Sequence, residues 1–478
     1  MTARWRSSFR TKSALALGLV AAADLLLFDH DVGANLGLFM LAALAVALAA
    51  HPETWRERRA QAAFGVAAGF CLLLIDRPGV IAWTLAALAL GVAVLSPRTD
   101  ARSDVGDWAL RLLRAGLMSV PAPVLDIRRA AARGGRPGAV RRLLVASALP
   151  VLGGAMFLGL FVLANPLIER GLAAWRLPPF SLARLLFSML MAVIAWALLR
   201  PRGARRRFMP VWRSRGPGTA SASVTLSLVV FNALFALQNA LDLAFLWSGA
   251  PLPEGVSFAQ YAHRGAYLLI VTALLAGGFV LVFLRPGAAQ SRAVRWLVIA
   301  WVGQNLLLVA SSALRTIDYV EAYGLTQLRI SALIWMALVG LGLVLICVRL
   351  VREKSASWLI GANAAALAVV LTGVAIADIG AVAASWNVRH AREATGDPRG
   401  PSLDVAYLRE LGPAALVPLT ELSRRPLPPG VAAQVQAAQR RTQAELAVRQ
   451  MHWRTWTWRG QRRLDAAAAL TGPIEAGS

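Results

Sequence analysis

The chain has very little lysine, and the residue patterns of several enzyme classes are missing. Of 50 basic residues in 478, only Lys12 and Lys354 are lysines, and neither stands in the Gly-Lys-Ser/Thr context of a phosphate-binding Walker loop. The five histidines are scattered and form no His-Glu-x-x-His zinc pattern. No Gly-x-Ser-x-Gly nucleophile elbow is present. We therefore expect no ATPase of the Walker type, no metal site and no cofactor.

Charged residues are also few, and the two cysteines suggest no redox chemistry. Only 16% of the residues are charged, against about a quarter in a typical soluble domain. Hydrophobic residues make up 57%, and the mean hydropathy is +0.57. Cys71 and Cys347 fall inside apolar blocks, where we expect them to pack as small hydrophobic side chains. This composition excludes a disordered chain, a coiled coil and a conventional soluble enzyme. It predicts a multi-pass membrane protein with a formal net charge of +25.

Apolar blocks that approach or meet the length of a membrane span recur along the chain. A spanning helix needs about 20 apolar residues, or about 17 when short. Eleven blocks qualify, and the first four are short enough to form two hairpins that dip into the bilayer. The sequence thus predicts an all-α polytopic transmembrane helix bundle of eleven spans with a small helical C-terminal extramembrane domain. The blocks run over residues 13–28, 34–50, 62–75, 79–95, 143–164, 185–199, 223–247, 265–284, 296–314, 330–348 and 358–383.

The distribution of basic residues predicts the orientation, because short cytoplasmic loops of membrane proteins collect arginine and lysine. With the N-terminus inside, the cytoplasmic segments hold 30 basic and seven acidic residues, whereas the short outer loops hold seven of each. The basic start of the chain is not expected to be a cleavable signal peptide, since Asp24 and Asp29 stand where small residues should be. We expect a cytoplasmic N-terminus and a C-terminus on the outer side.

Four regions follow from these patterns. Residues 1–95 are predicted to form short transmembrane hairpins, and residues 143–384 the main transmembrane bundle. Between them, residues 96–142 mix leucines with arginines and are expected to form one or two amphipathic helices on the inner leaflet. Residues 385–478 are predicted to form an outer helical tail.

The tail begins in a linker rich in proline, glycine and arginine. Its stretches 403–419 and 431–451 are predicted to be helical and amphipathic. Residues 453–458 contain three tryptophans with flanking arginines, and the residues after this motif show no strong structural pattern. Two arrangements of the tryptophans remain open: docking on the outer membrane face, or packing onto the tail helices. A protein partner that binds the tail is a further expectation.

Ionisable groups inside a membrane span are costly, and this makes them candidate functional residues. The acids in such positions are Asp24, Asp242 and Asp378. Asp24 and Asp378 stand alone near span ends, where we expect the carboxylate to reach water or to pair with a basic residue.

Asp242 belongs to a polar stripe on the seventh predicted span. At 100° per residue, Asp242, Asn232, Gln238 and Asn239 fall within about 120° of the helix circumference. One interpretation is a polar lining of a cavity or a proton path. The other is a hydrogen-bonded seam between two helices, in which each bond contributes about 0.6 kcal/mol. The sequence favours the seam only slightly.

A second polar stripe occurs on the ninth predicted span. If the seventh and ninth spans face each other, Asp242 can approach Arg315 near their outer ends. A buried ion pair of this kind would offset the cost of a lone carboxylate. The second stripe consists of Gln304, Ser311 and Arg315 close to one line, with Asn305 and Ser312 beside it.

Tyrosines cluster around the predicted outer ends of spans eight to ten, where four of the five in the chain occur. They can serve as interfacial aromatic residues. Alternatively, with the charged residues nearby, they form a polar outer vestibule that binds a ligand or relays protons. The cluster consists of Tyr261, Tyr267, Tyr319 and Tyr323, with Glu254, His263, Arg264, Arg315, Asp318, Glu321 and Arg329.

The arginine run of residues 200–215 contains no acidic residue. Such a run can suggest nucleic acid, but a cytoplasmic loop of a membrane protein is expected to be basic in any case. The partners that we expect are the lipid bilayer and anionic lipid headgroups at the cytoplasmic arginine loops, and not nucleic acid.

Several segments resemble an uncharacterised family of bacterial integral membrane proteins, the domain-of-unknown-function family 4153/4173. These segments are FNALFALQNALD at 231–242, YAHRGAY at 261–267, RTIDYVEAYGLTQLR at 315–329, LDVAYLR at 403–409 and the closing Trp-Arg region. They cover the latter half of the chain, whereas the first 140 residues match only by their hydropathy. The resemblance implies a bacterial inner-membrane protein and brings no assigned activity.

Three roles are compatible with these observations. The polar stripes suggest a transporter, although no clear repeat of broken helices is visible in two halves. The tail and the vestibule suggest a sensor or an assembly factor that contacts a partner. A membrane enzyme that acts on a lipid-linked substrate is the alternative, with His263, Glu321 or Asp318 as acid and base groups. The non-enzymatic roles together rank above the enzyme.

Overall fold

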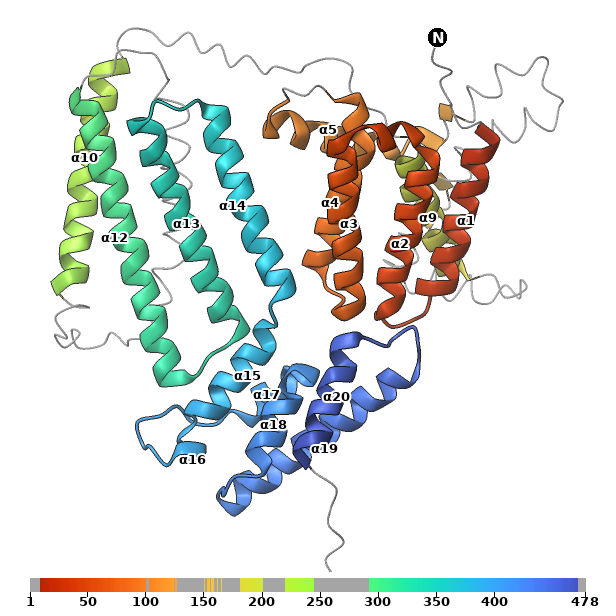
Figure 1. The fold of residues 1–478 in the computed structure, drawn as a ribbon. Helices are drawn as coiled ribbons and strands as arrows, with labels where there is room; N and C mark the ends of the chain where they lie inside the picture. The colour runs from red at the N-terminus through yellow and green to blue at the C-terminus, as the bar shows by residue number, and fades with distance from the viewer. Residues whose placement is uncertain are drawn as a thin grey trace, which may run out of the picture. The chain divides into compact units, whose positions relative to one another are not determined.

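The computed structural model consists of helices, and its described residues contain no strand (Figure 1). The predicted all-α membrane fold is therefore confirmed. The chain divides into two units: the first holds residues 1–208 and 448–461, and the second holds residues 209–447 and 462–478. The structure describes residues 9–99, 103–123, 125–126, 181–200, 220–244 and 292–471, with some further positions between 150 and 165.

Seven helices of the described residues are long and apolar enough to cross a membrane. Helix α2 (Ala34–Ala50) is a shorter apolar helix of 17 residues. The predicted spans 143–164 and 265–284 lie mostly or wholly outside the described residues, so the total of eleven stays a prediction. The seven helices are α3 (Arg58–Asp76), α4 (Val80–Leu95, extended by the 3-10 turn η2, Ser96–Arg98), α9 (Leu182–Leu199), α10 (Ala220–Asp242), α12 (Arg292–Tyr323), α13 (Gln327–Val351) and α14 (Ala356–Ile376).

The first unit begins with α1 (Phe9–Leu27), which packs antiparallel to α9. Lys12 near the start of α1 donates a 2.8 Å hydrogen bond to the carbonyl of Leu199 at the end of α9. At the other end of both helices, the Arg184 guanidinium forms a bidentate ion pair with the Asp24 carboxylate. The expected partner of Asp24 is thus found. We call the two ends of this unit the Lys12 end and the Asp24 end.

Helices α2, α3 and α4 follow α1 in the first unit, and each runs in the direction opposite to the helix before it (Figure 1). The 3-10 turn η1 (Pro52–Arg56) joins α2 to α3, and a short turn at residues 77–79 joins α3 to α4. Both α2 and α3 end just before a proline, Pro52 or Pro78, because proline lacks the N–H that continues a helix and restricts the residue before it. Half of the buried residues of α2 and of α4 are alanines, whose small side chains let the helices approach closely.

Beyond η2, the predicted amphipathic segment forms α5 (Val105–Ser119). Asp104 caps this helix by accepting a 2.9 Å hydrogen bond from the N–H of Asp107. Leu113 and Leu117 are exposed on one face, while Arg111 is buried. The expected helix is confirmed over these residues, and residues 127–149 lie outside the described part of the chain.

In the second unit, α10, α12, α13 and α14 surround an apolar core. The ring of Trp301 on α12 lies 5.4 Å from that of Phe231 and 6.0 Å from that of Phe235, both on α10, measured between centroids. Contacts along α10 and α12 follow in the same order in both helices, so the two run parallel. Leu228, Val298, Val302, Leu343 and Ile346 form the centre of this core.

The predicted span 358–383 is wrong in its last residues, because α14 ends at Ile376 and a new helix, α15 (Ile379–His390), begins at once. Asp378 lies between these helices and not within a span. Its carboxylate caps α15 by accepting a 3.1 Å hydrogen bond from the N–H of Ala381, and it pairs with Arg463. A carboxylate at a helix start satisfies free N–H groups there, which explains the break.

Helix α15 begins a helical domain, which we call the C-terminal domain, and the predicted tail helices are confirmed. Its core includes Val388, Leu408, Leu419 and Val435. The expectation of no strong structure after the tryptophan motif is wrong, since residues 458–471 form a helix. Four consecutive alanines at residues 466–469 explain it, because alanine has the highest helix propensity. The further helices are α16 (Arg392–Thr395), α17 (Val405–Glu410), η4 (Gly412–Ala415), α18 (Leu416–Ser423), α19 (Pro429–Met451) and α20 (Trp458–Thr471).

Candidate functional site: the polar seam and the ends of the helices

A polar seam joins α10 to α12 in the second unit. Asn232 donates a 3.0 Å hydrogen bond to the carbonyl of Leu297 and accepts a 3.0 Å bond from the side chain of Gln304. Further along the helices, the Asn239 amide donates to the carbonyl of Gln304 at 3.2 Å. The two polar stripes therefore face each other. Since each bond of this kind contributes about 0.6 kcal/mol on average, the seam fixes the register of the helices more than it stabilises them.

Asp242 and Arg315 close one end of this seam. An Arg315 guanidinium nitrogen lies 2.6 Å from Oδ2 of Asp242, and the two side chains are 12% and 1% exposed. Gln238 donates a 3.1 Å hydrogen bond to Oδ1 of the same carboxylate, so both carboxylate oxygens are bound. The ion pair expected from the sequence is confirmed. It holds a charge in a place where a lone carboxylate would be unfavourable.

Two oxygens within the seam are left without a partner. Oδ1 of Asn239 and Oε1 of Gln304 are inaccessible to solvent and have no hydrogen bond to the described residues. Buried acceptors without a donor are unfavourable by about 1–3 kcal/mol each, so they are sites where a proton donor or a cation could bind. The other predicted polar residues of α12 are also buried: Asn305, Ser311 and Ser312.

The predicted outer vestibule is described only in part. The rings of Tyr319 and Tyr323 lie 4.5 Å apart, and the Arg329 guanidinium lies 4.4 Å from the centroid of Tyr319. Arg329 also donates a 3.2 Å hydrogen bond to the carbonyl of Tyr323, which anchors the end of α12. The other predicted members are Asp318 and Glu321, exposed on the last turns of α12, and Glu254, Tyr261, His263, Arg264 and Tyr267, which lie outside the described residues.

The turn between α12 and α13 is clamped by the C-terminal domain, a contact that the sequence did not predict. Asn387 accepts a 2.6 Å hydrogen bond from the N–H of Leu325 and donates a 2.8 Å bond to its carbonyl. The Tyr407 hydroxyl accepts a 2.8 Å bond from the N–H of Gln327. Burial raises the pKa of Tyr407, and the Gln327 N–H opposes that shift. Gly324 permits the turn: its φ is +84°, and a Cβ there would lie 2.8 Å from Oδ1 of Asn387.

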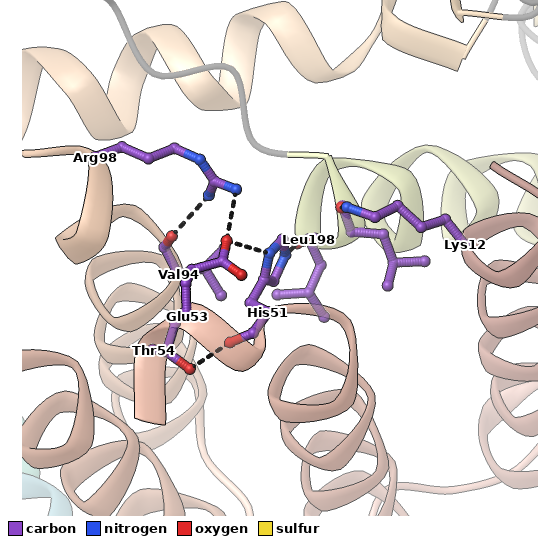
Figure 2. Close-up of polar contacts among 8 residues, drawn as sticks. Lys12, His51, Glu53, Thr54, Val94, Arg98 and Leu198 are labelled. Atoms are coloured by element: carbon purple, nitrogen blue, oxygen red, sulfur yellow. Dashed lines mark hydrogen bonds and ion pairs between the residues drawn. The ribbon is translucent and has the colours of Figure 1, made fainter. Parts of the chain in front are cut away.

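A second polar cluster lies at the Lys12 end of the first unit (Figure 2). His51 ends α2 and is 1% exposed; its Nε2 lies 2.9 Å from the carbonyl of Leu198, and its Nδ1 lies 3.5 Å from Oε1 of Glu53. Glu53 also accepts a 3.0 Å hydrogen bond from Arg98. Together with Lys12, His51 occupies the last carbonyls of α9, where the helix dipole favours positive charge.

Electrostatic effects on His51 oppose each other. Burial lowers its pKa, the Leu198 carbonyl raises it, Lys12 and Arg98 lower it, and Glu53 raises it. When the ring is protonated, both of its nitrogens face an acceptor, Leu198 on one side and Glu53 on the other. The signal that could have located this site is a His-Pro-Glu sequence directly after an apolar block.

Within the described part of the chain, no group of three or more His, Cys, Asp or Glu side chains could hold a metal ion. Comparison with curated proteins and with solved structures gave no match. The family model described as Domain of unknown function (DUF4153) matches residues 13–422, which is most of the chain. The resemblance of the motifs between residues 231 and 409 is therefore confirmed and extends into the first unit, whereas the closing Trp-Arg region lies outside the matched residues. The chain belongs to the DUF4153 family.

Proposed function

We propose that this membrane protein is a non-enzymatic sensor or assembly factor of the bacterial inner membrane. A protein partner bound to the C-terminal domain acts on the ion pair between α10 and α12. The observation that carries the proposal is the contact of Asn387 with both backbone groups of Leu325. Leu325 lies in the turn after α12, the helix that carries Arg315. Chains of such contacts can transmit a displacement between two sites.

The turn that Asn387 contacts is connected to the ion pair by a short stretch of continuous helix. Arg329 donates hydrogen bonds to the carbonyls of Tyr323 and Gly324, so the end of α12 is tied to the start of α13. Helix α12 is continuous from Arg315 to this turn, a distance of about 14 Å at 1.5 Å per residue. A movement of the turn would therefore displace Arg315 relative to Asp242, which lies on a different helix.

A charged groove on the C-terminal domain is the surface to which we assign the partner. The groove has a volume of about 320 Å³. Arg441 and Glu445 pair along α19 at 2.7 Å, and both are more than half exposed. A protein surface of mixed charge would complement it, since charge complementarity steers association and selects partners. The groove is lined by Ala406, Arg409, Glu410, Arg441, Thr442 and Glu445.

Photo-crosslinking in living cells tests this proposal. A photoreactive amino acid replaces either Arg409 or Arg441, which both line the groove. The control position is Arg440, which is exposed on α19 beside Arg441 but does not line the groove. We expect one protein adduct of the same mass from Arg409 and Arg441, and no such adduct from Arg440. Equal adducts from all three positions, or none from the two groove positions, would contradict the proposal.

A transport role is the second candidate, and the two buried acceptors in the seam favour it. Asn239 and Gln304 offer oxygens without donors in the same seam as the Asp242 carboxylate. Protein in proteoliposomes would then conduct protons or a cation, and Asp242→Asn would abolish the flux. Asn363→Ala is the control, because Asn363 bonds to Leu359 of its own helix. Equal fluxes from wild type and Asp242→Asn would exclude this role.

The proposed orientation has the N-terminus in the cytoplasm and the C-terminus in the periplasm. The charges in the first unit support it, since short cytoplasmic segments are rich in arginine and lysine. Alkaline phosphatase fused after residue 471 should be active in cells, and an inactive fusion that is stably expressed would reverse the assignment. The short segments at the Lys12 end carry the basic residues Lys12, Arg56, Arg58, Arg59, Arg98 and Arg200 and the acids Glu53 and Glu57, whereas the short segments that follow α1 and α3 and precede α9 at the Asp24 end carry the basic residues Arg77 and Arg184 and the acids Asp24, Asp29, Asp31 and Asp76.

A further inference from the structure

Residues 448–461, at the junction of α19 and α20, expose an unusual amount of apolar surface. Val448, Met451, Trp453 and Trp458 are each more than half exposed. Exposed side chains of this size within so short a segment mark an interaction surface rather than a surface that faces water alone. The segment belongs to the first unit, although it is far from the other residues of that unit in the sequence.

The backbone of this segment caps the start of α2 at the Asp24 end. The carbonyl of Trp456 accepts a 2.8 Å hydrogen bond from the N–H of Ala34, and that of Arg454 accepts a 3.1 Å bond from the N–H of Asn35. The first N–H groups of a helix have no partner within the helix, so these two bonds complete α2. The Arg454 side chain also donates to the carbonyl of Leu25 at 3.2 Å.

Two further contacts fix the segment in this position. Arg459 donates two hydrogen bonds, of 2.6 and 2.9 Å, to Oδ2 of Asp76 at the end of α3. Gly33 packs directly on the backbone of Thr455, and a Cβ at Gly33 would overlap it. The segment is therefore held against the ends of α1, α2 and α3; α3 is long and apolar enough to cross a membrane, and α2 is a shorter apolar helix.

This attachment places the exposed indoles beside the ends of α2 and α3 at the Asp24 end. Leu25, Val32 and Val80 are also largely exposed at the Asp24 end. Tryptophan is enriched at membrane–water interfaces because its ring is apolar and its N–H needs a polar partner. The Arg454 guanidinium lies 4.6 Å from the centroid of the Trp453 ring, so a cation already accompanies that indole.

We propose that residues 448–461 bind the phospholipid interface of the leaflet at the Asp24 end, with Trp453 and Trp458 inserted among the headgroups. Trp456 is half-buried and lies 6.5 Å from Trp458 between ring centroids, so it supports the neighbouring indole from the protein side. The segment thereby anchors the start of α2 to the bilayer surface. This interaction does not depend on the partner that we assign to the groove on the C-terminal domain.

A fluorescent probe next to the indoles tests the proposal in the full-length protein. The probe is attached to His452→Cys, an exposed position, in a Cys71→Ala/Cys347→Ala background, so that all three tryptophans remain. The protein is placed in phosphatidylcholine nanodiscs that contain a nitroxide at the headgroup or at carbon 5 of the acyl chain. We expect these lipids to quench the probe at least about twofold more strongly than a water-soluble nitroxide does, because the segment lies at the interface.

Paired variants separate lipid binding from a loss of folding. Trp453→Ser/Trp458→Ser and Gly33→Ala should each reduce quenching by the lipid nitroxide by at least about half, since the first removes the inserted rings and the second releases the segment. Gly79→Ala is the matched control: Gly79 also precedes a membrane helix, and a Cβ there has nothing within 4 Å. It should leave quenching unchanged.

Either of two results would overturn the proposal. The probe could be quenched mainly by the water-soluble nitroxide in nanodiscs that contain only this protein and lipid, which would point to a protein-binding surface instead. Alternatively, the lipid quenching could be the same in wild type and in both the tryptophan and the Gly33→Ala variants. Size-exclusion profiles equal to wild type confirm that each variant has kept its fold.

Discussion

The α10–α12 seam and the His51 cluster bury ionisable groups in different surroundings. In the seam, the Asp242 carboxylate lies at the end of α10, one of the candidate membrane spans, and is matched by the charged side chain of Arg315 on α12. In the His51 cluster, the buried ring lies at the end of a helix and is matched by a backbone carbonyl and by the partly exposed Glu53. A charge inside the bilayer requires an opposite charge, whereas at helix ends the free carbonyls and the helix dipole serve the same purpose. The two sites should therefore respond differently to mutation and to pH.

The largest effect is expected from breaking the ion pair of the seam. Arg315→Gln leaves the Asp242 carboxylate buried without its partner, and this should lower the free energy of unfolding by about 3–5 kcal/mol. Asp242→Asn/Arg315→Gln should lose less than the sum of the single variants. Unfolding in mixed detergent micelles measures each value. Strictly additive effects would contradict the ion pair.

An exposed pair on the same helix is the control for this measurement. Arg295 lies 3.0 Å from Glu353, and both side chains are well exposed. Arg295→Gln should change the free energy of unfolding by only about 0–1 kcal/mol, as is usual for exposed ion pairs. A loss as large as that of Arg315→Gln would mean that burial does not distinguish the two pairs.

A smaller loss is expected from His51→Ala. The variant removes the hydrogen bond that the buried His51 ring makes to the carbonyl of Leu198, which is partly buried, and this should lower the free energy of unfolding by about 1–3 kcal/mol. His51→Gln keeps a side-chain donor, and it should recover part of the loss. If Gln and Ala behave alike, the bond to Leu198 is not what stabilises this helix end.

The His51 cluster should also make stability depend on pH. Burial lowers the pKa of His51 in the folded protein, while the unfolded chain has the ordinary value of about 6.5. At pH values above about 6.5, His51 is neutral in both the folded and the unfolded protein. As the pH falls through this value, the unfolded chain takes up a proton more readily, so stability decreases. The free energy of unfolding should be measured above and below about pH 6.5. The wild type should be less stable at the lower pH, and this decrease should be smaller in His51→Gln. An equal loss in both would contradict this assignment.

The smallest effect is expected from a single polar residue of the seam. Asn232→Ala removes the interhelical bonds to Leu297 and Gln304, each worth about 0.6 kcal/mol. Asn363→Ala removes only a bond within α14, and it should be nearly neutral. The difference in unfolding free energy between the two variants measures how much the interhelical hydrogen bonds of Asn232 contribute to stability. A larger loss from Asn363→Ala would reverse the comparison.

The seam could be predicted from the sequence because a helix repeats every 3.6 residues. That period placed Asn232 and Asp242 on one face of α10 and Gln304 and Arg315 on one face of α12, and the apolar surroundings left each polar group in need of a partner. The composition and the lengths of the apolar blocks likewise predicted the membrane helices.

Contacts at helix ends had no comparable signal. Asn387 meets Leu325 across 62 residues of sequence, and Thr455 meets Gly33 from the other end of the chain, through backbone groups that any residue carries. The break at Asp378 was missed because the apolar residues continue on both sides of it. Hydropathy measures burial in the membrane, and it contains little information about where one helix stops and the next begins.

The central claim is that the C-terminal domain acts on the ion pair of α10 and α12 through Asn387. The most direct test is to measure the coupling energy of Asp242→Asn and Arg315→Gln twice, once in the wild-type protein and once with Asn387→Ala. Coupling should be strong in the wild type and clearly weaker in the Asn387→Ala background, because the turn after α12 is then released. An unchanged coupling energy would contradict the claim.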